Sequence, residues 1–232
     1  MTARAYTLAL EGATYEGGVA LIRDGDVICE RTVHASDGGT PRAGRGERLM
    51  PAIEECFSEA HIRNGRDELA RIVCGAGPGS FTSLRVAGSV AKGLAAGYGI
   101  DLYAVSSLAL SITGAKPPLP SGEYLSVLDA MRGEFFAARI TLAANGATMG
   151  IGSTSVISAA EIADLRMSEH ALQIVGPGQE IEARPHARGV APILDTIIAG
   201  GPVDLASWEP DYGRLAEAQV RWEATHGRRL AT

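Results

Sequence analysis

The sequence predicts an α/β protein in which helices pack on sheets of mixed strand direction. The first thirty-odd residues form three short apolar strands separated by glycine-containing turns. A helix, a strand, a second helix and another strand follow, and this order indicates that the later strands run parallel. With 232 residues and 46% hydrophobic content, the chain can bury one large domain or two small ones.

The opening strands are expected at Tyr6 to Glu11, Val19 to Arg23 and Val27 to Val33. The turn Asp24-Gly25-Asp26 joins the last two, so the three strands form an antiparallel meander. After a polar, glycine-rich loop, apolar residues recur at helical spacing: Leu49, Met50, Ile53, Phe57 and Ala60. This second segment is therefore predicted to be an amphipathic helix.

The next two strands enclose a second helix. Ala70 to Gly75 is a short apolar strand that runs into the glycine-rich loop 75–79. Ser80 can cap a helix that reaches about Gly97, and Asp101 to Val105 supplies the following strand. The loop could hold an anion at a helix start, but the Lys of a Walker motif is missing after Gly79. A tight turn into a capped helix is the favoured interpretation.

A break between two lobes is predicted near Ser107, because the stretch 113–122 is rich in proline and glycine. Beyond it, Tyr124 to Ala130 and Phe135 to Leu142 form a hairpin, and Leu172 to Val175 is a later strand. This order repeats the opening pattern in weaker form. We expect a first lobe at 1–107, a second lobe at 108–209 and a charged C-terminal helical segment at 210–232.

Composition excludes several classes of protein. No segment approaches the roughly 18 apolar residues of a membrane span, and a signal peptide is not recognisable, so a cytoplasmic protein without membrane contact is expected. Three cysteines at wide spacing, Cys29, Cys56 and Cys74, favour reduced core residues. The net charge is −6, and the arginine clusters are short: Arg42, Arg45 and Arg48, then Arg228 and Arg229. Strong tRNA binding by this chain alone is not expected.

The helix after the glycine-rich loop is apolar around most of its circumference. One stripe comprises Leu84, Ala87, Gly88, Ala91, Leu94 and Ala95, and it is widened by Val86, Val90 and Gly93. Such a helix is covered either by the chain's own second lobe or by a second protein. We favour the second protein, because Ala87, Ala91 and Ala95 would let another helix approach closely.

Candidate catalytic groups are sparse. The five histidines contain no i, i+4 pair, and the nucleophile motif G-x-S-x-G is missing from the sequence. Asp129, Arg132 and Glu134 form a charged cluster beside a core strand, which favours a solvated hairpin end with local ion pairs. The sequence therefore assigns no catalytic residue, no cofactor site and no metal site.

The chain resembles the TsaB family, also called YeaZ-like, within the actin-like group of proteins. The run Gly77 to Leu108, GPGSFTSLRVAGSVAKGLAAGYGIDLYAVSSL, is similar to the GPGSFTGLR signature of that family, its following helix and its GVSSL strand end. Weaker similarity covers the segment 48–51 against RLLP, Asp129 to Glu134 against DARRGE, and Pro210, Tyr212 and Arg214 against PxYLR. The resemblance spans most of the chain.

The resemblance implies an actin-like (ASKHA) fold of two ribonuclease-H-like lobes. It also implies a non-catalytic scaffold that binds and activates TsaD, the threonylcarbamoyltransferase of tRNA threonylcarbamoyladenosine modification. The ATPase TsaE would join this pair, and tRNA would be reached only through the complex. The partner-binding residues carried over are Leu49, Ile53, Phe57, Leu84, Ala87, Val90, Ala91 and Leu94. Without the partner, the same helices could form a homodimer.

Three positions depart from the family pattern: Glu11 replaces a common Asp, Arg45 a frequent His, and Gly213 a Leu. In actin-like kinases the Asp at the first hairpin holds Mg²⁺ through water, and the longer Glu11 would displace the metal. ATP hydrolysis is therefore not expected. The alternative is an autonomous actin-like phosphotransferase or a glycoprotease-like peptidase, in which loss of Glu11 or Asp129 would abolish turnover.

Overall fold

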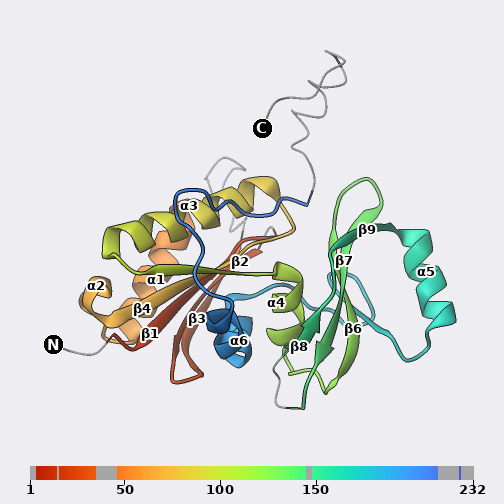
Figure 1. Cartoon of the computed structure of the whole chain (residues 1–232), viewed down its shortest axis with the longest axis horizontal. Coiled ribbons are helices and arrows are strands. Elements are labelled where there is room, and N and C mark those ends of the chain that lie inside the picture. The colour runs from red at the N-terminus through yellow and green to blue at the C-terminus, as the bar shows by residue number, and fades with distance from the viewer. Residues whose placement is uncertain (1–3, 15, 35–45, 145–147, 214–224, 226–232) are drawn as a thin grey trace.

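A computed structural model describes residues 4–14, 16–34, 46–144, 148–213 and 225. The chain forms two sheets side by side, with helices on their faces (Figure 1). The C-terminal segment predicted to be helical from Leu215 onward lies, apart from residue 225, outside the described residues.

The first sheet has the strand order β3-β2-β1-β4-β5. Its strands are β1 (Tyr6–Glu11), β2 (Glu16–Arg23), β3 (Asp26–His34), β4 (Leu69–Gly75) and β5 (Asp101–Val105). The first three are antiparallel, and β4 and β5 run parallel to β1. Leu8 pairs with Leu21 on one side and Ile72 on the other, which forms a fully buried row across the sheet. The meander and the parallel strands are confirmed.

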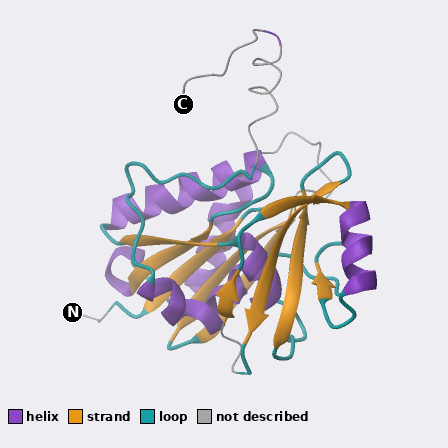
Figure 2. Ribbon diagram, turned by 45° about the vertical axis from the view of Figure 1, so that its right-hand side comes forward, coloured by secondary structure: helices purple, strands orange, loops and turns teal. Residues whose placement is uncertain are grey.

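Helices cover both faces of this sheet because its side chains alternate between two cores (Figure 2). The face of Leu8 and Ile72 packs under α1 (Gly46–Glu59) and α3 (Phe81–Tyr98). The opposite face, with Ala9 and Val73, packs under the 3₁₀ helix η1 (Ala187–Ile193) and α6 (Leu194–Ala199). A one-turn helix, α2 (Gly65–Glu68), precedes β4.

The second sheet has the order β10-β6-β7-β8, with β9 also paired to β7. Its strands are β6 (Gly122–Asp129), β7 (Glu134–Leu142), β8 (Thr148–Ile151), β9 (Ser155–Ser158) and β10 (Gln173–Val175). The helix α4 (Ser107–Thr113) packs on one face, toward the first sheet, and α5 (Ala159–Ser168) covers the other (Figure 1).

The second sheet repeats the first. In each lobe a strand pairs antiparallel with the strand that follows it, and a later strand lies parallel on its other side. Thus β6, β7 and β10 correspond to β1, β2 and β4. The weak internal repeat seen in the sequence is therefore confirmed as two related lobes, and the fold is the actin-like arrangement that the resemblance implied.

Two segments cross the lobe boundaries drawn from the sequence. Helix α4 begins where the boundary was placed, and η1 and α6, assigned to the second lobe, pack on the first sheet. After α6, the segment 200–213 runs back over the first lobe beside α3 (Figure 1). Val203 donates a hydrogen bond to the Leu102 carbonyl, and Asp211 donates to the Ala76 carbonyl. The first lobe is thus completed by residues distant in sequence.

Among the described helices, none is long and apolar enough to cross a membrane.

Candidate functional site

The glycine-rich loop after β4 is docked against the turn after β1. The backbone N–H of Ser80 donates to the Ala13 carbonyl at 2.7 Å. A Cβ atom on Gly79 would lie 2.2 Å from that same carbonyl oxygen, and one on Gly77 would lie 2.1 Å from the Asp211 carbonyl oxygen. Gly77 also has a φ of +94°, which favours glycine. Close packing of the chain on itself therefore accounts for these glycines. The turn is tight, as predicted, but the Ser80 side chain accepts a hydrogen bond from the Ser83 hydroxyl and does not cap α3.

Glu11 lies beneath this contact with no accessible surface. The Ala13 N–H donates to its Oε1 atom at 2.5 Å, and the Ser107 hydroxyl lies 3.1 and 3.0 Å from its two oxygens. Burial raises the pKa of the Glu11 carboxyl to about 7, although these hydrogen bonds lower it. A Cβ atom at Gly75 would lie 1.9 Å from Oε2, so only glycine fits beside the carboxyl. Glu11 thus joins β1, β4 and α4.

The hollow next to Glu11 is too small for a nucleotide. Its volume is about 20 Å³, and its lining includes Gly12, Leu49, Ser83 and Ala87. Sites for small molecules usually enclose about 300–1,000 Å³. A buried carboxyl whose hydrogen bonds are all made within the chain is poorly placed to hold a metal-bound phosphate. The geometry at Glu11 is therefore that of a structural group.

The inner face of α3 is covered by the chain itself. Leu84, Ala87 and Ala91 are buried against the rest of the chain. On a neighbouring side, a Cβ atom at Gly88 would lie 3.0 Å from Pro210, and Lys92 Nζ donates to the Trp208 carbonyl at 2.9 Å. The segment 200–213, rather than the second sheet, therefore covers this side of α3.

The eight residues proposed for partner binding divide into two groups. Five have almost no accessible surface: Leu49, Ile53, Leu84, Ala87 and Ala91. Three are half-buried at the edge of the same core: Phe57, Val90 and Leu94. A side chain without accessible surface cannot contact a second protein, so only the second group can reach a partner directly. The five buried residues hold α1 and α3 on the sheet.

The outward side of α3 carries small residues that the sequence did not single out for close approach. Ser89, Gly93, Ala96 and Gly97 are exposed, and among the residues that the structure describes nothing lies within 4 Å of a Cβ atom built at either glycine. We call this set the α3 outer stripe. Ala87 and Ala91, which were expected to admit another helix, face the chain's own core instead. The GLAAG run at 93–97, with glycines four residues apart, was the available signal.

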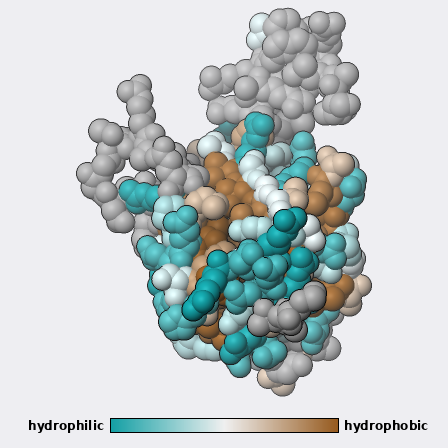
Figure 3. Space-filling model, turned by 90° about the vertical axis from the view of Figure 1, so that its left-hand side faces the viewer, coloured by the Kyte–Doolittle hydropathy of each residue, from teal (hydrophilic) through white to brown (hydrophobic). Residues whose placement is uncertain are grey.

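Hydrophobic side chains are also exposed near the starts of α1 and α3. Met50 of α1 and Phe81 at the start of α3 are 37% and 36% exposed, and Val86 is half-buried. Figure 3 views the end of the molecule that carries α2, and a hydrophobic band runs between hydrophilic areas on this face. At the start of α3, the Phe81 ring lies 4.5 Å from the Tyr212 ring, centroid to centroid. The two helices thus offer an apolar surface with room for close backbone approach.

The charged hairpin tip 129–134 is exposed and stabilised locally. Asp129 Oδ1 accepts a hydrogen bond from the Met131 N–H at 2.7 Å, and the Ala130 N–H donates to the Glu134 carbonyl. Met131 and Arg132 have φ angles of +66° and +60°, as a tight left-handed turn requires. This geometry supports the interpretation of a solvated hairpin end.

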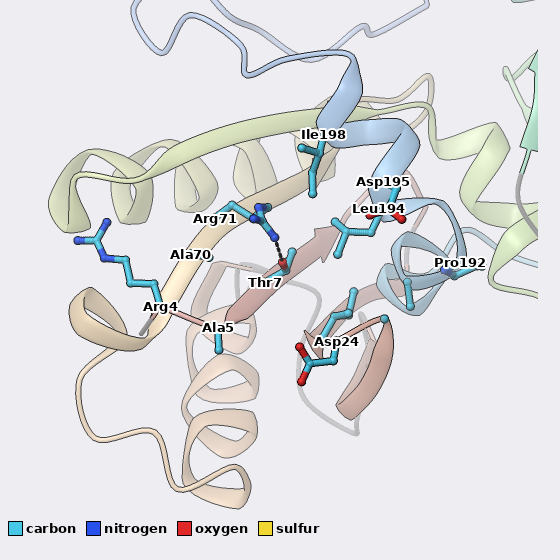
Figure 4. A pocket seen from close by; sticks show the side chains of 13 residues that line it. Arg4, Ala5, Thr7, Asp24, Ala70, Arg71, Pro192, Leu194, Asp195 and Ile198 are labelled. Atoms are coloured by element: carbon cyan, nitrogen blue, oxygen red, sulfur yellow. Dashed lines mark hydrogen bonds between the residues drawn. The ribbon is translucent and has the colours of Figure 1, made fainter. Parts of the chain in front are cut away.

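A larger hollow of about 600 Å³ lies at the opposite end of β1 (Figure 4). Arg71 in its floor donates to the Thr7 hydroxyl at 3.1 Å, and Arg4 points away from it. Asp24 and Asp195 are exposed and come from separate elements, the β2–β3 turn and α6. This arrangement does not bring an acid and a base together.

Histidine and metal chemistry receive no support from the geometry. His186 is buried, its Nδ1 accepts from the Arg188 N–H, and its Nε2 lies 3.2 Å from the Thr32 hydroxyl. Burial lowers the pKa of His186 to about 4, so the ring is neutral at pH 7. In the described part of the chain, no three His, Cys, Asp or Glu side chains lie close enough together to form a metal site.

Most of the arginines that form the two short basic clusters lie outside the described residues: Arg42, Arg45, Arg228 and Arg229.

Comparisons with known proteins identify the family of the chain. Residues 29–199, about three quarters of the chain, match the family described as TsaD: tRNA N6-adenosine threonylcarbamoyltransferase. The chain belongs to the TsaD family. The matched region contains α1, α3 and the glycine-rich loop, while Glu11 and the segment 200–213 lie outside it.

Within this family the chain is of the TsaB, or YeaZ-like, type. The tRNA threonylcarbamoyladenosine biosynthesis protein TsaB of Bacillus subtilis is 25% identical over 231 residues, which cover 93% of this chain and 96% of that protein. The TsaB protein of Escherichia coli is 29% identical over 178 residues, covering 77% and 73%. Both relatives therefore match along most of their length.

A solved structure of a YeaZ-like protein has a similar fold. A Pseudomonas aeruginosa protein described as similar to peptidase YeaZ superposes with a TM-score of 0.74 at 25% sequence identity. The match covers 90% of this chain and 100% of that protein. The two-lobed architecture is thus shared by a YeaZ-like protein over its whole length.

Proposed function

We propose that the chain acts in tRNA threonylcarbamoyladenosine biosynthesis as a non-catalytic subunit. It binds a TsaD-type threonylcarbamoyltransferase through its first lobe and keeps that enzyme in an active shape. The names of the TsaB relatives support the pathway, because they match this chain over most of their own length. The membership of the chain in the TsaD family supports pairing between two proteins of related fold.

The observation that carries the binding role is the α3 outer stripe. Glycine inside a helix costs about 0.5–1 kcal/mol relative to alanine, yet a Cβ atom at Gly93 or Gly97 would meet no atom of the described residues within 4 Å. Small residues at this spacing let a second helix approach until backbones touch. Half-buried Phe57, Val90 and Leu94, together with exposed Met50, would supply the surrounding apolar contact.

The non-catalytic role rests on Glu11 and its surroundings. In an actin-like enzyme the acid at this hairpin faces a nucleotide, whereas Glu11 is enclosed and bonded to Ala13 and Ser107. The adjacent 20 Å³ hollow leaves no space for a phosphate chain. An autonomous phosphotransferase or peptidase would need a different set of groups, and the described residues offer none brought together for that purpose.

The other partners follow from the same proposal. A TsaE-type ATPase would join the pair, and tRNA would be held by the transferase and not by this chain. The net charge of −6 is consistent with a subunit that does not itself hold a polyanion. When the transferase is missing, two copies of this chain could pair through the same stripe, because like surfaces pair about a two-fold axis.

The test places one charge on the proposed surface and another, as a control, elsewhere. Ala96 in α3 and Ala163 in α5 are both exposed alanines inside helices. We expect Ala96→Arg to weaken binding to the TsaD-type protein by at least tenfold and Ala163→Arg to leave it unchanged, measured by calorimetric titration. Both variants should keep the wild-type Tm, because both side chains project into solvent.

Two outcomes would contradict the proposal. Equal affinity of the Ala96→Arg and wild-type proteins would remove α3 from the interface. Threonylcarbamoyl transfer, nucleotide turnover or proteolysis by the isolated chain, lost on Glu11→Ala or Asp129→Ala, would favour the autonomous enzyme. Sedimentation of the chain with and without its partner separates self-association from pairing with the transferase.

A further inference from the structure

Two cysteines lie in contact between β3 and α1. The Sγ atoms of Cys29 and Cys56 are 2.9 Å apart. A disulfide bond requires about 2.05 Å, so the two sulfur atoms need to approach by only about 0.9 Å. Cys74 is not part of this pair, since its Sγ contacts the Gly75 carbonyl on β4.

The surroundings of the two sulfur atoms differ. Cys56 has no accessible surface, whereas Cys29 is 4% exposed and lines a groove of about 1110 Å³ beside β3. The Nη1 atom of Arg31 lies 3.1 Å from Cys29 Sγ, and Arg31 is held in place by Glu55 and Glu59 of α1. A small oxidant entering the groove therefore meets Cys29 first, beside the ion pair of Arg31 and Glu59.

The causes of the pKa shifts also distinguish Cys29 from Cys56. Burial raises the pKa of both thiols, which keeps them protonated and slow to react at neutral pH. At Cys29 the contact with Cys56 and the charge of Arg31 lower the pKa, while Glu59 raises it; at Cys56 the contact with Cys29 adds to the effect of burial. Cys29 is thus the easier of the two to ionise.

We propose that Cys29 and Cys56 form a site of reversible thiol oxidation, with a hydroperoxide as the oxidant. With hydrogen peroxide, the Cys29 thiolate attacks one peroxide oxygen and the O–O bond breaks. The leaving hydroxide takes up the proton that the Cys29 thiol released, so a sulfenic acid and one water form. The Cys56 sulfur then attacks the Cys29 sulfur, the S–O bond breaks, and a second water leaves with the Cys56 proton. Two thiols are oxidised and one peroxide is reduced.

The product ties α1 to the edge strand of the first sheet. The two cysteines are 27 positions apart in sequence, so the cross-link closes a covalent loop between β3 and α1. Closing such a loop restricts the unfolded chain. We expect the oxidised protein to unfold at a Tm roughly 5–10 °C higher than the reduced protein.

The test uses hydrogen peroxide on the full chain, followed by intact mass measurement and peptide mapping. Exposed Met167, with 78% of its surface accessible, reports that the treatment was effective. We expect the wild-type protein and Cys74→Ser to lose two hydrogens between Cys29 and Cys56, with recovery on adding a dithiol reductant. In Cys56→Ser, Cys29 should be trapped as a sulfenic acid by dimedone, while in Cys29→Ser the thiol of Cys56 should persist.

Three results would overturn the proposal. The first is oxidation of Met167 while both thiols of the pair remain reduced. The second is a disulfide that includes Cys74 or joins two chains. The third is equal dimedone labelling of Cys29→Ser and Cys56→Ser, which would remove the distinct role of Cys29.

Discussion

Glu11 carries the strongest residue-level argument, because its carboxyl is enclosed by β1, Gly75 and Ser107. The sequence showed that an acid longer than the usual Asp stands at the first hairpin, and for that reason metal binding was not predicted there. It could not show the burial. Besides the local hydrogen bond from the Ala13 N–H, the contacts that bury Glu11 come from Gly75 and Ser107, which are 64 and 96 positions away and cannot be inferred from the hairpin sequence.

The raised pKa of Glu11 predicts a pH dependence of stability. The unfolded carboxyl ionises near pH 4.5 and the folded one near pH 7, so the unfolded state gains stability as pH rises between these values. The contribution of Glu11 to the free energy of unfolding is fully present below pH 4.5 and is lost by pH 7. Between these values the free energy of unfolding falls by up to about 1.4 kcal/mol per pH unit. Urea unfolding of the wild type and Glu11→Gln from pH 4 to 8 measures it.

The difference between these two proteins isolates Glu11. His186 has a lowered pKa, so it removes stability as pH falls from 6.5 toward 4, in the opposite sense. Both proteins contain His186, and its effect cancels in the difference. A difference in unfolding free energy that stays constant across the range would contradict the burial of Glu11.

Gly75 offers a second prediction at the same place. Gly75→Ala would put a methyl group 1.9 Å from Glu11 Oε2, and we expect it to destabilise the fold by about 1–3 kcal/mol. Gly150→Ala, where a Cβ meets nothing within 4 Å, is the matched control and should change stability little. In a Glu11→Ala background the cost of Gly75→Ala should shrink, because the clashing carboxyl is gone. An undiminished cost in that background would refute the proposed contact.

At the scale of elements, regular patterns were predicted well where local sequence determines them. The strands at Tyr6–Glu11 and Asp101–Val105 match their predicted bounds, and α3 ends within one residue of the expected position. Helix α4 was missed because the boundary was placed at its first residue, on account of the stretch 113–122 that is rich in proline and glycine. In the structure Ser107 bonds to Glu11 and Ser111 to the Ser107 carbonyl, so these polar residues are buried without cost.

Which side of α3 stays exposed could not be predicted from its own sequence. The helix is apolar nearly all round, and Trp208 and Pro210, more than a hundred positions later, decide which side is covered. Local periodicity identifies an apolar stripe but not the segment that will pack on it. The candidate surface therefore moved from Ala87 and Ala91 to Gly93 and Ala96.

Gly93→Ala tests the α3 outer stripe through two opposed effects. An alanine in an exposed helix interior should stabilise the isolated chain by about 0.5–1 kcal/mol. The added methyl group should also keep a partner helix from approaching closely and so weaken binding. Urea unfolding and titration with the TsaD-type protein measure the two effects. Unchanged or tighter binding would show that close approach at Gly93 is not used.

At the scale of the whole molecule, the class and the two-lobed repeat were predictable because each lobe repeats one order of hairpin and parallel strand. The packing of η1 and α6 on the first sheet could not be predicted from the sequence, because these short helices could pack on either lobe. Their placement leaves both faces of the first sheet covered, and α1 and α3 form its outer layer on one side. That layer is where the account places a second protein.

The central claim is tested most directly by sedimentation velocity of the purified chain mixed with a TsaD-type transferase, with transfer to tRNA assayed on the same samples. The account predicts a stable one-to-one complex, TsaE-dependent transfer by that complex, and no transfer by the chain alone. Separate sedimentation of the two proteins, or transfer by the isolated chain, would contradict it.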